Sequence, residues 1–548
     1  MAIAGLCAPP LPKILFELMS LQAQAFDTSS VMQMFTTPAM RQNYLSTLLC
    51  ATVIAIGSCP AAAADAPQPD WSALRVQDVV RAALHQGASA LSQGMDLRVQ
   101  VAQAALARRE FLPQGTLTAQ AERSRSTSSG AADSGSRTGS VGLESSLKLR
   151  NGASVSASVA RSSLLNSSDA SPVDSSFTSS AGASATALQT TRSVTFTQPL
   201  FRGAGVAVAT ANERLAEIGL SITKKNFVQS MSAIVLDCVT AYFAVDQAHR
   251  SVELAQASLD RAAQLHKINE SLFAAGRIAQ TALLQNDADD AAAELALAQA
   301  RHTEQVAKRR LVSLMGMQTP DPDSVPVNTA ESFTSYLNPV IPDEQATVQR
   351  GLAQRADVRI AQDNVSSAQL ARISARDNMR DQLNVYARVD NQSVKTLERS
   401  SGTSQAVGVT YALTLDKSSA RVAADAAEVA IRKAELALAE AQRNASAEIR
   451  DAVRSLSFAI EQQRLAQRSA EMTTKRLDNE TEKARLGRSS ATDLSVAQDS
   501  LRQANAQALQ AQYAVLQAQL EVQRVTGTVL EAWQSAGLVD ELLASGVK

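Results

Sequence analysis

Cysteine, aromatic residues and net charge are all scarce in this chain. Its 548 residues include four cysteines, 4% aromatic residues and a formal net charge of −1. A near-neutral chain lacks the basic character that nucleic-acid binding needs, so no nucleic-acid partner is expected. Three cysteines, Cys7, Cys50 and Cys59, lie before residue 65. Cys238 is left alone, which excludes an internal disulfide there and favours a small buried apolar residue.

Motifs of catalytic and ligand sites are also missing. The four histidines do not share a metal-ligand spacing, and no Gly-x-Ser-x-Gly motif occurs. Gly203-Ala204-Gly205 is too short for a phosphate-binding loop and follows a lone predicted strand. We therefore expect a protein that is not an enzyme and that has no cofactor and no metal site.

Proline is absent from residues 204–315, and the only late glycine there is Gly276. Because Ala, Leu, Gln, Glu and Arg favour helices and Gly favours their ends, this stretch predicts two long helices joined at Gly276. Apolar residues recur at the four-three spacing of a coiled-coil seam, at Met231, Val235, Cys238, Tyr242 and Val245. Roughly seventy residues at ~1.5 Å each would span about 100 Å.

The helical stretch occurs twice. Gly276-Arg277 is matched by Gly487-Arg488, and Gly316 is matched by Gly527. Both pairs are offset by 211 residues, so the second arm has the same length in both copies. Equal arms indicate a structural duplication. The copies are predicted at residues 65–316 and 343–527, with a Pro- and Asp-rich linker at 317–342 and a short, weakly helical tail at 528–548.

Upstream matches place an insertion in the first copy. Asp96-Leu97-Arg98 resembles Asp357-Val358-Arg359 at an offset of 261, and Val194 matches Val407 at 213. The first copy therefore carries roughly fifty extra residues, which we assign to the Ser/Gly-rich residues 123–191.

Two interpretations of this insert are open. Asn151-Gly152 between alternating runs predicts a β-hairpin, whereas Leu164 to Ala187 has no period and predicts a loop that can be deleted. The insert is either a surface loop, leaving four strands per chain, or a source of two more, giving six. Its Ser/Gly-rich composition favours four strands, because such residues face lipid poorly.

Residues 40–64 have the three parts of a secretory signal peptide. Met40-Arg41 is the basic start, Leu45 to Ile56 is the apolar core, and Ala62-Ala63-Ala64 is the small-residue cleavage site. The mature chain is expected to begin at Asp65, and residues 1–39 are expected to be an extension outside the mature protein.

Lipidation is a second interpretation of the same segment. Ile56-Gly57-Ser58-Cys59 resembles the acylation motif of bacterial lipoproteins, in which Cys59 would carry the lipid. Pro60 directly after Cys59 and the better cleavage site downstream favour cleavage.

Strands in an exported protein are stable in a membrane only as a closed barrel. Two strand pairs in one chain are too few to close one, so several chains must contribute. The expected fold is mainly α with a small β part. It consists of long antiparallel coiled-coil helical hairpins in two structural repeats, with strands that contribute to a shared membrane β-barrel.

These features together resemble the TolC-type outer-membrane efflux proteins over nearly all of residues 71–530. The resemblance is carried by Thr197 to Gly205, by the two Gly-Arg turns, and by the Asp and Leu that follow the second turn between Gly487 and Gln498. The second strand-to-helix junction, Leu413 to Lys417, departs from the first because it lacks Pro and Gly. Arg380-Asp381-Gln382 likewise lacks the Pro that ends the equivalent helix in the first copy.

The resemblance implies a homotrimer with one barrel in outer-membrane lipid and a tapering tunnel of helices in the periplasm. It also implies an exit duct of a tripartite efflux or type I secretion system, docked to a periplasmic adaptor protein and an inner-membrane transporter. The competing function is a periplasmic structural coiled coil or adaptor without a pore.

Site residues follow from the same resemblance. The turns at Gly276, Arg277, Gly487 and Arg488 would contact the adaptor, although both arginines would equally serve as cations at a helix C-terminus. Asp493 would form a ring of carboxylates at the pore constriction. The alternative for Asp493 is a charge that complements the positive N-terminus of its own helix.

Overall fold

The structure is a computed structural model of the 548-residue chain. It describes residues 73–126, 134–168, 186–276, 278–316, 326–337, 339–395, 399–485 and 488–547. The predicted signal peptide, its cleavage site and Cys59 lie outside these residues.

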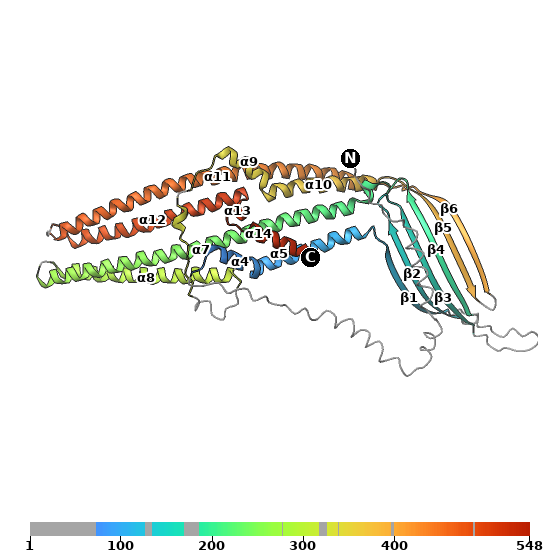
Figure 1. Cartoon of the computed structure of the whole chain (residues 1–548), viewed down its shortest axis with the longest axis horizontal. Coiled ribbons are helices and arrows are strands. Elements are labelled where there is room, and N and C mark those ends of the chain that lie inside the picture. The colour runs from blue at the N-terminus through green and yellow to red at the C-terminus, as the bar shows by residue number, and fades with distance from the viewer. Residues whose placement is uncertain are drawn as a thin grey trace, which may run out of the picture. The chain divides into compact units, whose positions relative to one another are not determined.

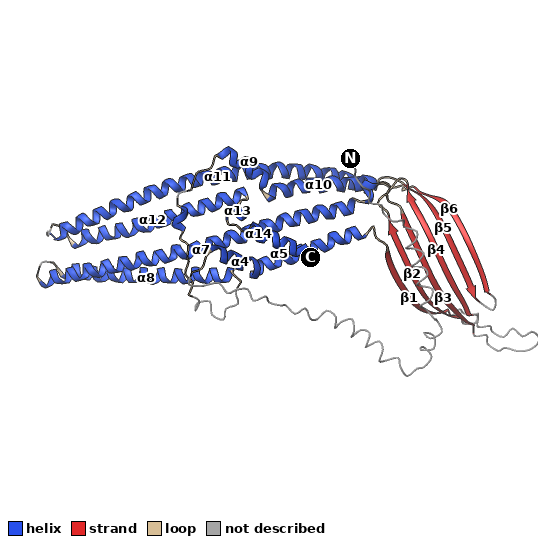
Figure 2. Cartoon of the chain, viewed as in Figure 1, coloured by secondary structure: helices blue, strands red, loops and turns tan. Residues whose placement is uncertain are grey.

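The described residues form two similar series of helices and strands (Figure 2). The first contains α4 (Val76–Gln86), α5 (Ala88–Arg109), β1 (Gln114–Ser126), β2 (Ser134–Lys148), β3 (Ser154–Ser168), β4 (Thr186–Pro199), α6 (Val206–Ala209), α7 (Ala211–Ala274) and α8 (Gln280–Leu314). The second contains α9 (Glu344–Gln354), α10 (Ala356–Asp377), β5 (Gln382–Lys395), β6 (Arg399–Ala412), α11 (Ser418–Arg485) and α12 (Ala491–Thr526). A short 3₁₀ helix, η4 (Phe333–Tyr336), lies between them, and α13 (Val529–Ala532) and α14 (Ala536–Val547) follow.

Element lengths show the duplication directly. Helices α4 and α5 have 11 and 22 residues, and α9 and α10 have the same lengths 268 residues later. The predicted upstream offset of 261 is therefore wrong by seven residues, because one heptad of a helix resembles the next. The first residues of β1 and β5 are still 268 residues apart in the sequence. The last residues of β4 and β6 are only 213 residues apart. The inserted residues therefore lie between β1 and β4.

Two long helical hairpins dominate the chain (Figure 1). Helix α7 has 64 residues and packs along α8, and α11 has 68 residues and packs along α12. At ~1.5 Å per residue, each long helix extends for about 100 Å, as predicted. Gly276 ends the first hairpin's outward helix with φ 69°, a left-handed conformation that favours glycine.

Helices α9 and α10 are separated by a single turn of the chain. The turn lies at Arg355, which has ψ 129°. Gly351 explains the close approach there, because a Cβ atom on it would lie 2.4 Å from Ile449 of α11. The Arg355 guanidinium then bonds to Asp357 at 2.6 Å and to Glu448 at 2.7 Å, which fixes the turn against α11.

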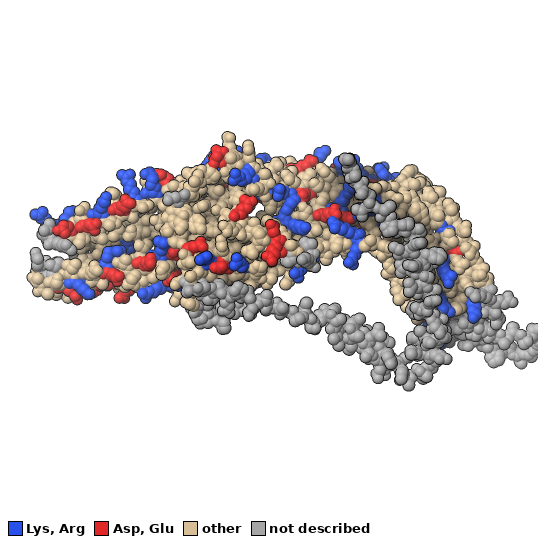
Figure 3. All heavy atoms as spheres, viewed as in Figure 1, with Lys and Arg blue, Asp and Glu red and all other residues tan. Residues whose placement is uncertain are grey.

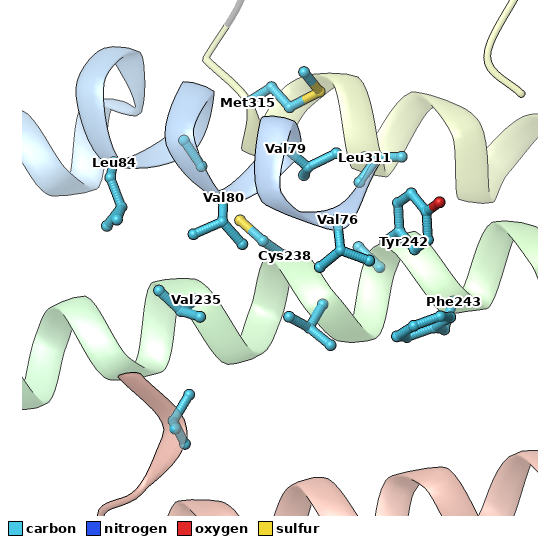
Figure 4. Packing of buried hydrophobic residues seen from close by; sticks show 14 of the residues in the cluster. Val76, Val79, Val80, Leu84, Val235, Cys238, Tyr242, Phe243, Leu311 and Met315 are labelled. Atoms are coloured by element: carbon cyan, nitrogen blue, oxygen red, sulfur yellow. The ribbon is translucent and has the colours of Figure 1, made fainter. Parts of the chain in front are cut away.

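The main core lies where α4 and the C-terminal helices pack on α7 and α8 (Figure 4). It contains all five predicted seam residues of α7, and Cys238 and Tyr242 are fully buried. Burial raises the pKa of the Cys238 thiol to about 12, which keeps it protonated and confirms its role as a small apolar residue.

Polar side chains of α7 hold the segment between the two repeats against this core. The Tyr242 hydroxyl donates to the Leu74 carbonyl at 2.8 Å and accepts from the Glu331 N–H at 2.9 Å. Four residues later, the Asp246 carboxylate accepts from the Ser332 hydroxyl at 2.8 Å and from the Phe333 N–H at 3.0 Å. These buried bonds satisfy backbone groups that would otherwise be costly to bury.

The strands form a single antiparallel sheet of six, in the order β1-β2-β3-β4-β5-β6. The preferred count of four strands per chain is wrong, because the insert supplies the β2–β3 hairpin around Asn151-Gly152. The prediction of a loop from Leu164 to Ala187 is also wrong for the two ends of this stretch. Leu164 belongs to β3 and pairs with Ala187 of β4. Deleting that whole stretch would shorten two strands.

Candidate functional site

Exposed apolar side chains gather on one face of the sheet. Directly paired residues of antiparallel strands share a face, and pairing aligns Leu117 with Leu143 and Leu143 with Val159. A second row runs from Phe196 through Ala387 to Val407. Leu117 is 74% exposed and Val407 is 83% exposed. A continuous exposed apolar face of this kind requires a cover of lipid or protein.

The opposite face is polar, and it explains the error in strand number. In β3, Ser154, Ser156 and Ser158 alternate with Val155, Ala157 and Val159, which places the serines on the face away from Val159. The Ser158 hydroxyl bonds to the Ser193 hydroxyl of β4 at 2.7 Å on this polar face. A Ser-rich strand can therefore face lipid on one side, since alternation rather than total composition decides what each face presents.

The sheet is open within the chain. β1 pairs only with β2 and β6 pairs only with β5 among the described strands, so each has one edge of unpaired backbone groups. Open edges cannot lie in lipid, because nothing there replaces the missing hydrogen bonds.

The two strand-to-helix junctions form equivalent turns with different residues. After Pro199, Gly203 and Gly205 have φ values of 83° and 95°, and the Gly203 N–H donates to the Asp377 carboxylate at 2.7 Å. The second junction lacks Gly and Pro but uses Asp416, whose carboxylate accepts from the Ser418 N–H at 2.8 Å at the start of α11. This hydrogen bond lowers the pKa of Asp416. Lys417 then pairs with Asp381 at 2.6 Å.

The hairpin ends are described in part. Arg277 and Gly487 lie outside the described residues, so their predicted roles stay predictions. The Arg488 backbone N–H donates to the Lys483 carbonyl at 2.8 Å and so satisfies the end of α11. The Gly276 N–H does the same for α7, donating to the Phe273 carbonyl at 2.8 Å.

Asp493 lies in the first turn of α12, in a reciprocal capping arrangement with Ser490 that the sequence interpretation did not include. Its N–H donates to the Ser490 hydroxyl at 3.1 Å, and its carboxylate accepts from the Ser490 N–H at 3.2 Å and from the Ser490 hydroxyl at 2.6 Å. Hydrogen bonds from Ser490 lower the pKa of Asp493, so the carboxylate is charged at neutral pH. The Ser-x-x-acid spacing of a capping box was the signal for it.

Neighbouring residues hold the two hairpins together near these ends. Leu494, next to Asp493, is buried with Leu265 of α7 and Leu477 of α11. The Ser495 hydroxyl donates to the Asp289 carboxylate of α8 at 2.5 Å. Asp493 is thus exposed on a helix whose adjacent residues are fixed by packing.

Comparison with known proteins gives a family match for part of the chain. The sequence model of the family described as "Outer membrane efflux protein" matches residues 154–317, from β3 to the end of α8. These residues carry an outer membrane efflux protein domain. This match confirms the predicted resemblance to the TolC-type outer-membrane efflux proteins over these residues. A search of the curated proteins gave no match.

Solved structures of outer-membrane channels and of a related outer-membrane protein share the fold. The Campylobacter jejuni CmeC outer membrane channel is 14% identical with a TM-score of 0.64, and the match covers 86% of this chain and 89% of that one. The Neisseria gonorrhoeae MtrE outer membrane channel in its open state is 18% identical with a TM-score of 0.59, and the match covers 83% and 89%. The Vibrio cholerae outer membrane protein VceC is 16% identical with a TM-score of 0.60, and the match covers 82% and 96%.

The shared fold extends beyond the matched domain to both repeats. It confirms the predicted class, mainly helical hairpins with a small antiparallel sheet. Together with the matched domain, it makes this chain similar to outer-membrane channels.

Proposed function

We propose that this chain is the passive exit duct of a tripartite efflux or type I secretion system. The observation that carries the proposal is the six-stranded sheet with one exposed apolar face and two open edges. A periplasmic coiled coil or adaptor without a pore would place that face in water, where an exposed apolar surface of this extent promotes aggregation.

The proposed assembly is a homotrimer. Three copies of a six-stranded sheet give a barrel of eighteen strands, in place of the twelve that four strands per chain predicted. Because barrel diameter grows roughly linearly with strand number, the barrel would be about half again as wide. Barrels of 16–18 strands are wide enough to leave an aqueous channel.

In the same proposal the hairpin ends dock the partners. The ends near Gly276 and Arg488 would contact a periplasmic adaptor protein, which would connect them to an inner-membrane transporter. The backbone hydrogen bonds of Gly276 and Arg488 support this role, because they fix these two residues at the ends of α7 and α11 for a partner to recognise.

Conductance in a planar bilayer tests the proposed duct. The purified full-length protein should produce discrete ion-conducting steps, since the polar face of the sheet would line a water-filled lumen. Insertion without conductance would contradict the duct and support a structural role.

The proposed constriction at Asp493 leads to a separate prediction that distinguishes charge from helix capping. Asp493→Asn keeps a hydrogen-bond acceptor for Ser490 but removes the charge, so we expect it to lower cation selectivity and block by multivalent cations. Ser490→Ala removes the cap but keeps the charge, so selectivity should persist while the helix start loses about 0.5–2 kcal/mol.

The sign of the pH effect follows from the lowered pKa of Asp493. The stabilisation by its charged cap is present above the unfolded-state pKa and is lost as the pH falls through the lower folded-state pKa. Selectivity measured against pH in the bilayer reports the same titration. If Asp493→Asn and wild type have equal cation selectivity, Asp493 is only a helix-capping residue.

A further inference from the structure

Charged residues of the sheet divide by face. All acidic residues of the described strands, Glu122, Glu144 and Asp390, lie on the polar face. Among the strand residues whose side chains the structure describes, pairing places five basic residues on the apolar face, and we call them the cation belt: Arg123, Arg137, Arg161, Arg192 and Lys395. The apolar face of the described strands is therefore exclusively positive where it is charged.

Four of the five belt residues lie in two neighbouring pairs. Arg123 lies directly opposite Arg137 in the pairing of β1 with β2. Like charges directly opposite each other in a sheet are destabilising, so this pair favours a shared anion.

The second pair is diagonal. Arg161 pairs with Thr190 and Val159 pairs with Arg192, which makes the two arginines next neighbours on the same face of β3 and β4. Diagonal positions are within reach of long side chains, so one anion could contact both guanidinium groups.

Three belt residues, Arg123, Arg137 and Lys395, lie towards the end of the sheet away from the helices. Arg161 and Arg192 lie at the middle of β3 and β4. Figure 3 shows Lys and Arg side chains on the sheet. In β1, Arg123 follows Gln114 by nine residues, or roughly 30 Å at ~3.4 Å per residue. This is comparable with the apolar band of about 25 Å on membrane barrels. With the helices in the periplasm, Arg123 reaches the level of the outer leaflet. Arg161 and Arg192 lie seven residues from Ser154 and Pro199, so their long side chains would have to extend towards that level.

We propose that the cation belt binds the phosphate groups of lipids in the outer leaflet. The proposal rests on the proposed function, because it requires the apolar face to face lipid. Phosphate supplies the anion that each pair lacks on its own face, and arginine binds it through two parallel hydrogen bonds. The aliphatic stems of Arg and Lys lie along apolar surface while their charged ends reach the headgroups.

Lipid binding by the intact protein tests the proposal. The full-length protein in detergent is mixed with bisphosphorylated or monophosphorylated lipid A, and bound lipid is counted by native mass spectrometry. The wild-type protein is expected to bind more bisphosphorylated than monophosphorylated lipid A. The double variants Arg123→Gln with Arg137→Gln, and Arg161→Gln with Arg192→Gln, are each expected to lose part of that preference, and Lys at the same positions is expected to retain it.

Arg388→Gln is the matched control, because Arg388 lies on the polar face of β5 and bonds to Asp390 at 2.7 Å. It should leave lipid preference unchanged. An equal loss in this control, or full preference in both double variants, would overturn the proposal. Displacement of the lipid by sodium pyrophosphate alone at equal concentration would also overturn it, since the site would then bind free phosphate.

If a double variant fails to fold, the proposal is tested by the salt dependence of lipid binding to the wild type. The preference for bisphosphorylated lipid A must weaken as sodium chloride is added. A preference that does not change with salt would overturn the proposal. Conductance of wild type in phosphatidylcholine is measured in parallel. An absence of conductance would count against the proposed function. Conductance without a preference for bisphosphorylated lipid A would overturn only the proposal that the cation belt binds lipid phosphate.

Discussion

Val194→Arg is expected to prevent most of the protein from assembling in the outer membrane. Val194 is 51% exposed on the apolar face of β4. An Arg on the lipid face of a membrane barrel costs about 2–4 kcal/mol at the bilayer midplane and less near the interfaces. A symmetric trimer would carry this cost three times. Quantitative immunoblotting of outer-membrane fractions after a high-salt wash measures the loss.

Thr195→Arg is the matched control for this variant. Thr195 is the next residue of β4 and lies on the polar face, opposite Ser156 of β3. We expect it to assemble like wild type and to conduct with reduced cation selectivity, because it would add positive charge to the lumen. Equal assembly of the two arginine variants would show that the apolar face is not in lipid.

Phe243→Ala is expected to cause the largest loss of stability in the helical part. Phe243 is fully buried, and its ring centroid lies 5.1 Å from that of Tyr242, 5.4 Å from that of Tyr336 and 6.1 Å from that of Trp533. Truncating a buried Phe to Ala removes these contacts and leaves a cavity, at a cost of about 3–5 kcal/mol. The change should lower the urea midpoint of helix unfolding measured by circular dichroism.

Phe273→Ala is the comparison near the end of the first hairpin. Phe273 is 41% exposed, so its truncation should change the free energy of unfolding by no more than about 0.5 kcal/mol. A similar loss in both variants would mean that the cluster around Phe243 does not hold the two repeats together.

The helical architecture could be predicted because its signals are local and repeated. The seam through Met231 and Tyr242 and the glycine at Gly276 each follow from helix geometry, and all three occur where predicted. The heptad error in the upstream offset has the same origin, because a repeating pattern fixes the type of element better than its alignment.

The sheet was harder to predict because its stability depends on pairing partners. The serines of β3 suggested a loop by composition, whereas pairing with β2 and β4 places every second residue on an apolar face. The Asp493 cap was missed for another reason. Ser490 and Asp493 have the spacing of a capping box, whereas the resemblance concerns only the charge of Asp493.

Native mass spectrometry of the protein extracted from outer membranes tests the central claim most directly. The open edges of β1 and β6 must be paired by other copies of the chain, so the expected mass is that of three chains, with eighteen strands in the shared barrel. A monomer that remains folded and membrane-embedded would contradict the account, because its sheet would then have to be stable in lipid with both edges unpaired.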